Sequence, residues 1–518
     1  MGNEGNINPI LKMDYPDPDV IRVGDTYYMA STTMHFFPGC AILRSYDLVN
    51  WEILSYVYDH LDGTAAQRME EDKSIYGQGM WAPSLRFHRG MFYVCFVAND
   101  THKTYLYTAK TAEGPWDRQE IEGFYHDCSL LFDEDDRVYI VYGNTEIHLT
   151  ELRQDLSGPL AGGIDRIIIR ERDNPRLGYE GSHIYKIDGK YYVFLIHSLK
   201  DRWMRVQACF AAESLNGEFT GGDVFEDTIG YCGQGVAQGG IVDTPWGDWY
   251  AVLFQDRGAV GRIPVLVPMR FENGFPIVGD NGRMPKEIAY KSTRPDHVYV
   301  PLFDSDNFSY APNRSGRVIL KKVWQFNHEP DEALWEVRDN TFRITTGKIC
   351  SNPVQARNTL TQRLLFPGCR VEVTLDVQKL NDGDCAGLCA LQSCYGMVAV
   401  KMEDGRAYLV MGARETDDES MTPMKPFDGS AVEYEKIPLE RQQVRLFLEV
   451  DFYRMKDTAV FGYMDDRNSI RVGRAHKLYF KLDHFCGCRA GLFMFSARQT
   501  GGTAIFSNFI FKPSEGIP

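Results

Sequence analysis

The chain has 518 residues, of which 44 % are hydrophobic and 13 % aromatic, and its formal net charge at pH 7 is −15. This length exceeds what one hydrophobic core usually serves, so two or more globular domains are expected. The negative charge argues against nucleic acid and against an anionic membrane as partners, because both require clustered Lys and Arg. The residues after Met1 do not resemble a secretory leader, and no run of about 18 apolar residues occurs. We therefore expect a cytoplasmic protein, and a homo-oligomer stays open.

The twelve cysteines do not follow the spacing of a disulfide framework. The closest pair is Cys486 and Cys488, and no second pair of Cys or His residues stands near it to complete a zinc site. We therefore expect free thiols, without disulfides and without a metal bound by cysteine.

The first half of the chain repeats one β pattern five times. Each copy has an apolar strand, a short Gly/Asp turn and an aromatic-rich strand, whereas helical periodicity is weak throughout. The copies are Val23–Met29, Phe87–Val94, Phe132–Ile140, Ile187–Val193 and Asp243–Ala251. The spacings between their tyrosines are 65, 46, 53 and 58 residues for the series Tyr28, Tyr93, Tyr139, Tyr192 and Tyr250. Such spacings are typical of propeller blades rather than of solenoid repeats, so we predict a five-bladed β-propeller.

Polar residues recur at the start of the first strand of each predicted blade. Counting back 11 or 12 residues from each tyrosine gives Asp17, Trp81-Ala82, Asp127, Glu180 and Gln238. The first strand of a blade lines the central channel, so these positions should converge on the propeller axis. Three carboxylates in one pocket are costly unless they share protons or bind a ligand. Taken singly, each acid also has a structural interpretation, as a turn cap at Asp17, a loop residue at Asp127 or an exposed bend at Glu180.

The three carboxylates fit glycoside hydrolysis, which uses one protonated acid and one ionised base on either side of the scissile bond. Glu180 suits the proton donor because Glu has the longer reach and the higher unperturbed pKa. Asp17 would then be the base, and the third acid would tune the donor. Trp81 and Phe36 would offer apolar surface to a sugar ring, with core packing as the alternative for both.

Asp17 stands between two other acids and two prolines. Asp14 and Asp19 are expected to be solvated or to cap turns, with Asp19 the better candidate for a supporting hydrogen bond. The offset of Asp17 from its tyrosine is 11, against 12 for Asp127 and Glu180. One residue normally turns a side chain to the other face of a strand, so we expect a local bend at the prolines to restore its direction.

Several short motifs of the first half resemble those of glycoside hydrolase family 43. They are Asn8–Lys12, Tyr15-Pro-Asp-Pro-Asp19, Phe37-Pro-Gly39, Ser45–Trp51, Trp81-Ala-Pro-Ser84, Glu113-Gly-Pro-Trp116, His126-Asp-Cys-Ser129 and Tyr179-Glu-Gly-Ser-His183. Members of that family are five-bladed propellers that act on β-xylosides and α-L-arabinofuranosides with inversion. The resemblance implies Asp17 as general base, Asp127 as the orienting and pKa-tuning acid and Glu180 as general acid. It also implies that Arg262 contacts a substrate hydroxyl, with a surface ion pair as the alternative.

The second half of the chain is again rich in β patterns and resembles the C-terminal β-sandwich of the xylosidase-like members. The motifs that carry this likeness are Trp324–Asp331, Ala356–Arg363 and Gly383–Leu388. We place the propeller in residues 1–302 and a concanavalin-like sandwich in residues 303–518, which makes the whole chain all-β. In such relatives a sandwich loop closes one side of the pocket, and we expect that loop near Arg498–Gly502.

Two positions depart from the family pattern. Gln238 stands where many relatives carry a His that supports an axial calcium ion or a water cluster. We therefore expect no required cofactor and no metal ligand set, with Ca²⁺ on the axis as the alternative, since Gln offers a carbonyl oxygen. We nevertheless expect Gln238 to contact substrate. His35-Phe36 replaces the Glu-Trp that is common in xylosidases, which leaves the preferred sugar open.

The leading interpretation is an inverting, exo-acting glycosidase that releases terminal xylose or arabinofuranose from short xylo- or arabino-oligosaccharides. The alternatives are a sugar-binding propeller without catalysis and a scaffold or adhesion protein. A lectin gains little from three clustered acids, and an adhesin would need an export signal.

Overall fold

The β repeat of the first half folds into five antiparallel sheets in the computed structural model, which describes residues 7–314, 316–424 and 431–514. The strands of the first three sheets are β1 (Asp19–Val23), β2 (Thr26–Ser31), β4 (Gly39–Ser45) and β5 (Glu52–Tyr58); β6 (Met80–His88), β7 (Met91–Ala98), β8 (Lys103–Ala109) and β9 (Asp117–Ile121); and β10 (Ser129–Phe132), β11 (Val138–Asn144), β12 (Glu146–Leu152) and β13 (Asp165–Arg170). Those of the last two are β14 (Glu180–Ile187), β15 (Lys190–Ser198), β16 (Arg205–Ala212) and β17 (Thr220–Phe225); and β18 (Val236–Ala237), β19 (Ile241–Asp243), β20 (Trp249–Asp256), β21 (Arg262–Glu272) and β22 (Phe275–Val278).

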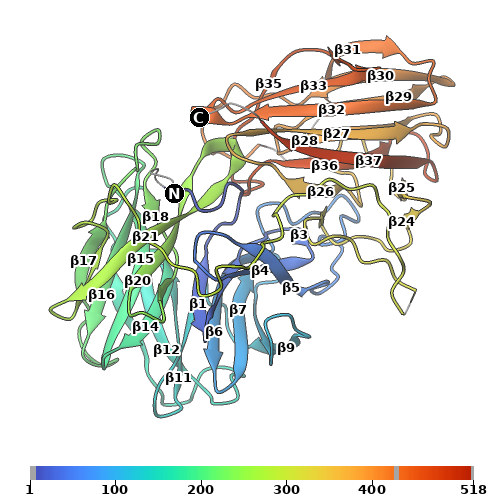
Figure 1. The fold of residues 1–518 in the computed structure, drawn as a ribbon. Helices are drawn as coiled ribbons and strands as arrows, with labels where there is room; N and C mark the ends of the chain where they lie inside the picture. Colours follow the sequence, from blue (N-terminus) through green and yellow to red (C-terminus); the bar gives the residue numbers. More distant parts are fainter. Residues whose placement is uncertain (1–6, 315, 425–430, 515–518) are drawn as a thin grey trace.

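The first strands of these sheets lie next to one another around a common axis. Strand β6 contacts β1 and β10, and β10 contacts β14. The amide of Ile241 on β19 donates to the hydroxyl of Tyr185 on β14, and β19 also contacts β1, which closes the circle. All five tyrosines of the repeat lie on the second strand of their sheets. The predicted five-bladed propeller is confirmed, and it occupies the blue-to-green half of Figure 1.

Two larger sheets follow and form the β-sandwich that the sequence predicts. One has the order β3-β23-β26-β36-β28-β29-β30-β31, and the other has the order β24-β25-β37-β27-β32-β33-β34 with β35 paired to β33. Their strands are β3 (Phe36–Phe37), β23 (Gln325–Asn327), β24 (Trp335–Arg338), β25 (Thr341–Thr345), β26 (Leu360–Arg363), β27 (Gly368–Asp376), β28 (Asp384–Leu391), β29 (Gly396–Glu403), β30 (Arg406–Ala413), β31 (Val432–Pro438), β32 (Gln443–Asp451), β33 (Thr458–Asp465), β34 (Asn468–Arg471), β35 (His476–Lys477), β36 (Arg489–Ser496) and β37 (Thr503–Pro513).

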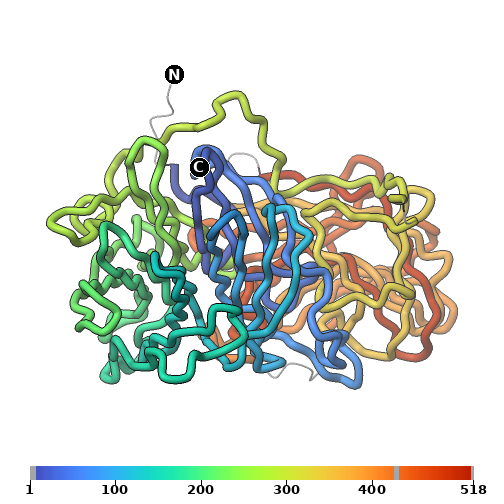
Figure 2. Tube along the Cα trace, turned by 90° about the horizontal axis from the view of Figure 1, so that it is seen from below, coloured from blue at the N-terminus to red at the C-terminus, as the bar shows by residue number. Residues whose placement is uncertain are grey.

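The connector between the two halves runs from the last blade across the outside of the first blade before it enters the sandwich (Figure 2). It is fastened there by hydrogen bonds from the amide of Thr293 to the carbonyl of Tyr46 and from the amide of Val300 to Glu52. The last propeller strand ends at Val278 and the next strand begins at Gln325, so the expected boundary at 302/303 falls within this connector.

The propeller and the sandwich are joined by a shared sheet edge and a shared hydrophobic core. Strand β3 comes from a loop of the first blade but pairs with β23 at the edge of a sandwich sheet. One continuous hydrophobic cluster contains Tyr15 and Val260 from the propeller side and Phe366 from the sandwich side. This shared core holds the sandwich in a defined position over the propeller. Within the described residues the helical segments are the 3-10 turns η1 (Gly258–Val260) and η2 (Tyr453–Met455), and no helix there is long and apolar enough to cross a membrane.

All twelve cysteines are free thiols, as predicted. Even the close pair Cys95 and Cys128, with sulfur atoms 3.6 Å apart, is unbridged.

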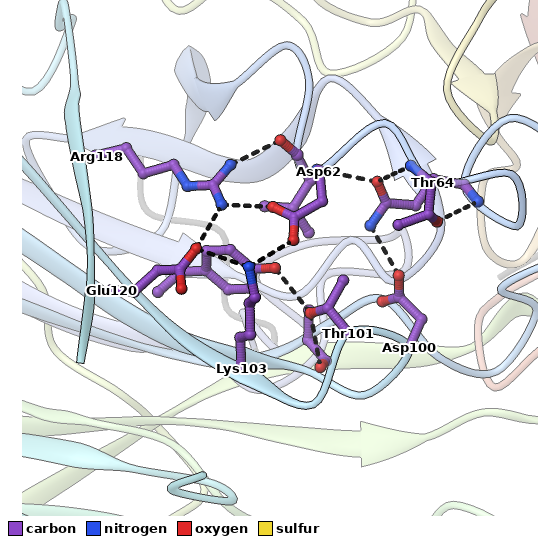
Figure 3. Close-up of polar contacts among 11 residues, drawn as sticks. Asp62, Thr64, Asp100, Thr101, Lys103, Arg118 and Glu120 are labelled. Atoms are coloured by element: carbon purple, nitrogen blue, oxygen red, sulfur yellow. Dashed lines mark hydrogen bonds and ion pairs between the residues drawn. The ribbon is translucent and has the colours of Figure 1, made fainter. Parts of the chain in front are cut away.

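A long loop between the first two blades is held in place by a polar network (Figure 3). Asp62 forms ion pairs with Arg118 and with Lys103, the latter at 3.1 Å, and Lys103 also reaches Glu120 at 2.9 Å. The fully buried Gln67 accepts the amide of Asp62 and donates to Asp100 at 2.7 Å. The network fastens the start of the loop to the second blade, and the far end of the same loop contributes Gly77 to the pocket described below.

Three buried histidines, His35, His328 and His484, gather around Tyr76 where the propeller meets the sandwich. Burial is the main cause that lowers the pKa of His484 to about 3 and holds the pKa values of His35 and His328 well below the usual range. The folded protein therefore keeps these rings neutral, whereas the unfolded chain protonates them near pH 6.5.

The contribution of these three rings to stability should therefore be constant above about pH 7 and fall as the pH drops below 6.5, because the unfolded state then binds more protons. At pH 5 His484 alone accounts for about 2 kcal/mol of lost unfolding free energy. Urea unfolding at pH 8, 6 and 5 measures this slope. The variant His35→Phe should flatten the slope and the exposed control His102→Gln should not; an unchanged slope in His35→Phe contradicts the assignment.

Candidate active site

A cavity of about 290 Å³ opens at one end of the propeller axis, beneath the sandwich. Its walls come from all five blades and from one loop of the sandwich, and its lining residues are Asp17, Met34, Gly77, Trp81, His126, Asp127, Asn144, Glu180, Arg205, Gln238, Arg262, Leu482 and Phe485. Six of the seven residues predicted for the site therefore meet in one cavity.

The convergence is produced by a repeated backbone turn at the start of the first strand of each blade. One residue of each turn has a left-handed φ, and the five are Asp17 (53°), Ala82 (35°), Asp127 (49°), Gly181 (64°) and Gln238 (57°). Non-glycine residues rarely adopt this conformation, and such strain gathers at functional sites. The bend expected at Asp17 is thus present in every blade. In the fourth blade the turn residue is Gly181, so the carboxylate of Glu180 comes one position earlier.

Asp17 is held by an ion pair with Arg262. A guanidinium nitrogen of Arg262 donates to Oδ1 of Asp17 at 2.9 Å, and both side chains are buried. A second nitrogen of Arg262 donates to the carbonyl of Phe485 in the sandwich loop at 3.2 Å, and the guanidinium lies 4.6 Å from the Phe485 ring. A charged, hydrogen-bonded pair of this kind holds the carboxylate in a defined direction. The surface ion pair considered for Arg262 is therefore a buried one inside the pocket.

Asp127 lies between the other two acids. Burial raises its pKa to about 6, with a further contribution from the charges of Glu180 and Asp17, while His126 acts in the opposite direction. The amide of Gly181 donates to Asp127 at 3.1 Å, so this carboxylate holds the backbone next to Glu180. The charge of Asp127 in turn raises the pKa of His126 to about 9. The imidazole nitrogen Nε2 of His126 stands 3.7 Å from Asp127 and 3.9 Å from Glu180.

Glu180 is the most exposed of the three acids. Its side chain is 18 % exposed, against 7 % for both Asp17 and Asp127. The amide of Asn144 donates to Oε2 of Glu180 at 2.5 Å, and the Glu180 side chain forms part of the cavity wall. A carboxyl group placed this way can reach the leaving group of a bound glycoside, as required of a general acid.

Arg205 is a pocket residue that sequence reasoning missed. Its Nε donates to Asp256 at 2.5 Å. Burial acts to lower the pKa of Arg205, but the charge and hydrogen bond of Asp256 raise it above the usual value, with smaller contributions from the charges of Glu180 and Asp17. It lies on β16, the third strand of its blade, outside the first-strand positions that the repeat compares. His126 and Asn144 were also missed as pocket residues, although His126 directly precedes Asp127 in a quoted motif.

The sandwich closes one side of the cavity, but with a loop other than the expected one. Leu482 and Phe485 line the cavity, and the Phe485 ring lies 5.3 Å from the indole of Trp81. The expectation for Arg498–Gly502 was wrong, because Arg498 is an exposed residue paired with Asp382 and Asp404. A hydrogen-bonded ion pair at a loop tip satisfies the charge of Arg498 without any ligand.

Trp81 and Gln238 line the cavity as expected, whereas Phe36 does not. Phe36 is 1 % exposed and pairs with Asn327 through strand β3, and the guanidinium of the buried Arg489 lies 3.4 Å from its ring. Core packing, the alternative considered for Phe36, describes this position.

The neighbours of Asp17 have structural roles. Asp14 is buried and accepts the amides of Arg262 and Gly487, each at 2.8 Å, so the expectation that it is solvated was wrong. These bonds tie the sandwich loop to the propeller. Asp19 is fully buried, so the expectation that it is solvated was wrong as well, whereas the supporting hydrogen bond expected there is present, because Asp19 accepts the amide of Leu85 at 2.7 Å.

Ligand atoms of His126, Asp127 and Glu180 in the cavity lie within 4.8 Å of one another, so these three side chains could hold a metal ion. Deeper on the axis the carboxylate of Asp19 is paired with a guanidinium nitrogen of Arg86 at 2.7 Å and with Nδ1 of His183 at 3.1 Å. Elsewhere in the described residues His35, His484 and Cys486 lie within ligand distance of one another, and the nearby charges of Arg489 and Arg414, which further lower the pKa values of the two histidines, also oppose a bound cation.

Both halves of the chain match models of known protein families. The model of the family described as "Glycosyl hydrolases family 43" matches residues 7–276, and that of the "Beta xylosidase C-terminal Concanavalin A-like domain" matches residues 317–512. The chain is 25 % identical to a beta-xylosidase of Formosa agariphila over 97 % of this chain and 90 % of that protein. It is 23 % identical to a non-reducing end alpha-L-arabinofuranosidase of Bacteroides ovatus over 64 % of this chain and 63 % of that protein.

Among solved structures, the chain is similar to a bifunctional GH43-CE protein of Bacteroides eggerthii. The two superpose with a TM-score of 0.89 at 40 % sequence identity over 99 % of this chain. The chain spans 64 % of the length of that protein.

Proposed function

The chain belongs to glycosyl hydrolase family 43, and from that membership we propose that its pocket releases terminal xylose or arabinofuranose from xylo- and arabino-oligosaccharides by an inverting mechanism. The observation that carries this proposal is the meeting of Asp17, Asp127 and Glu180, from three blades, in one cavity that the sandwich closes on one side.

In the proposed reaction Glu180 protonates the glycosidic oxygen while Asp17 removes a proton from the attacking water. The bond from the anomeric carbon to the leaving oxygen breaks as the bond to the water oxygen forms, and inversion follows from attack on the opposite face. The ion pair with Arg262 supports the base role of Asp17. Asp127 orients the donor through its hydrogen bond with the amide of Gly181.

The shape of the pocket supports action on chain ends. A cavity of about 290 Å³ lies at the lower end of the volumes that hold drug-sized ligands, so it suits a small terminal unit. Leu482 and Phe485 close one side of this cavity. The names of the relatives support both sugars.

Hydrolysis of nitrophenyl β-xyloside and nitrophenyl α-L-arabinofuranoside tests the activity, with and without a chelator. Activity on at least one substrate that survives chelation is the expected result, and inactivity on both overturns the proposal. Proton NMR of the first-formed anomer tests the stereochemistry, because a retained configuration would make Asp17 a nucleophile rather than a base.

The wall residue Phe485 should contribute to substrate binding. Its ring faces Trp81 and covers the guanidinium of Arg262, so Phe485→Ala removes apolar surface and exposes the ion pair with Asp17 to water. We expect kcat/KM for a xylo- or arabino-disaccharide to fall about 10- to 100-fold, since a pocket aromatic contributes on the order of 1–3 kcal/mol.

Arg498→Ala is the matched control for Phe485→Ala, because it truncates another sandwich loop whose side chain is exposed. Its kcat/KM should stay within twofold of wild type. Equal losses in the two variants would contradict the assignment of Phe485 to the pocket wall.

A further inference from the structure

One guanidinium, that of Arg86, occupies the propeller axis below the acids. Its Nη1 donates to Asp19 at 2.7 Å, its Nη2 donates to the hydroxyl of Ser129 at 2.6 Å, and its Nε donates to the carbonyl of Leu130 at 2.7 Å. A longer bond of 3.3 Å reaches the carbonyl of Ile184. Arg86 itself lies on β6, so a single side chain links the first strand of its own blade to those of three others.

These partners stand in a fixed relation to the catalytic acids. Asp19 and Ser129 lie two residues after Asp17 and Asp127, and His183, the ring partner of Asp19, lies two residues after the turn residue Gly181. The residues two positions after the turn residue of each blade therefore form a second ring, and a hydrogen bond joins its members Asp19 and His183 on the axis.

The remaining two positions of the second ring are filled by small residues. Ser84 accepts the amide of Leu130 at 3.1 Å, and Gly240 leaves space for Asp19, because a Cβ there would come within 2.7 Å of its Oδ1. The axis is therefore closely packed around the guanidinium.

The guanidinium of Arg86 forms a buried ion pair with the carboxylate of Asp19. Although burial acts to raise the pKa of Asp19, the charges of Arg86 and His183 hold it below the usual value. The Arg86 side chain is 12 % exposed and that of Asp19 is fully buried, so the pair is screened from water. A buried, hydrogen-bonded pair of this kind has a defined geometry and is strongly weakened when one partner is removed.

We propose that Arg86 is a positioning residue for the hydrolysis, a built-in axial cation that sets the spacing of the strands that carry Asp17, Asp127 and Glu180. The inference rests on the proposed function. The planar fork of Arg reaches several acceptors in fixed directions, which a Lys ammonium does not reproduce. Displacement of catalytic groups by about 1 Å can cost about 100-fold in rate, so the loss should appear in kcat rather than in KM.

The variant Arg86→Ala leaves a cavity of the size of a guanidinium beside Asp19. We expect its kcat to fall about 100-fold with KM within threefold of wild type. Millimolar guanidinium ion, far below denaturing concentrations, should restore at least tenfold of that loss and raise the melting temperature of this variant. The control Arg89→Ala removes an exposed arginine of the same hairpin, paired with Asp136, and should show neither the loss nor the rescue.

A folded Arg86→Ala with wild-type kcat overturns the proposal, as does a loss of kcat that guanidinium does not relieve. If Arg86→Ala does not fold, Arg86→Lys retains the charge without the fork, and wild-type kcat in that variant overturns the proposal. If the wild type cleaves neither glycoside, the proposed function fails by itself. The melting temperature of Arg86→Ala then still tests the axial site, because an unchanged value in guanidinium contradicts a cation site there.

Discussion

Asp17→Asn is expected to lower kcat about 1,000-fold on both xylosides and arabinofuranosides, because a positioned general base contributes about 10²- to 10⁴-fold. Asn has nearly the shape of Asp and still offers an oxygen to Arg262, which donates to Oδ1 of Asp17 at 2.9 Å. The fold should therefore survive, and what is lost is the ability to accept a proton from water.

Steady-state kinetics with an unactivated disaccharide measure this effect, with the melting temperature as a check on folding. Asp25→Asn is a matched control, because Asp25 lies in the same blade and is half exposed in an ion pair with Arg294. Its kcat should equal that of wild type. A loss of less than tenfold in Asp17→Asn would exclude Asp17 as the base.

Glu180→Gln is expected to have an effect that depends on the leaving group. Loss of the proton donor should lower kcat/KM about 1,000-fold for a disaccharide, whose alkoxide leaves poorly without protonation. The loss should be far smaller for a nitrophenyl glycoside, because nitrophenolate leaves without help. The amide of Asn144, which donates to Glu180 at 2.5 Å, can donate to the carbonyl oxygen of Gln as well, so the side chain should keep its place.

The ratio of kcat/KM on the two substrates is the measurement. Glu122→Gln serves as control, because Glu122 is 75 % exposed and pairs with Arg153 on the outside of the propeller. Equal losses on activated and unactivated substrates would show that Glu180 does not donate the proton.

The three acids differ in environment in a way that supports their different roles. Asp127 has a pKa raised to about 6 by burial and by its neighbours, yet its side chain is only 7 % exposed and is committed to the amide of Gly181. Glu180 has the greater exposure, and Asp17 has the cationic partner. The greater exposure of Glu180 therefore suits the proton donor, and the ion pair of Asp17 suits the base. Asp127, bonded to the backbone beside Glu180, suits the orienting role.

Much of the propeller can be predicted from the sequence because each blade is built from local information. Alternation along a strand and a Gly/Asp turn reveal a hairpin, and five matched tyrosines reveal five blades. Since the repeat brings equivalent positions to one axis, Asp17, Asp127, Glu180, Trp81 and Gln238 could be placed in one pocket from spacing alone. The offset of 11 residues between Asp17 and Tyr28 also predicted the local bend at Asp17.

The rest was decided by packing between elements that are far apart in the sequence. Phe485 and Leu482 meet Asp17 only because the shared core seats the sandwich on the propeller, and no local pattern encodes that contact. Phe36 lies outside the pocket for the same reason, because strand β3 pairs with the edge of a sandwich sheet. Arg205 and Arg86 are placed by partners on other strands, Arg205 by Asp256 and Arg86 by Asp19. Periodicity shows which residues share a face, whereas only the tertiary structure decides what that face meets.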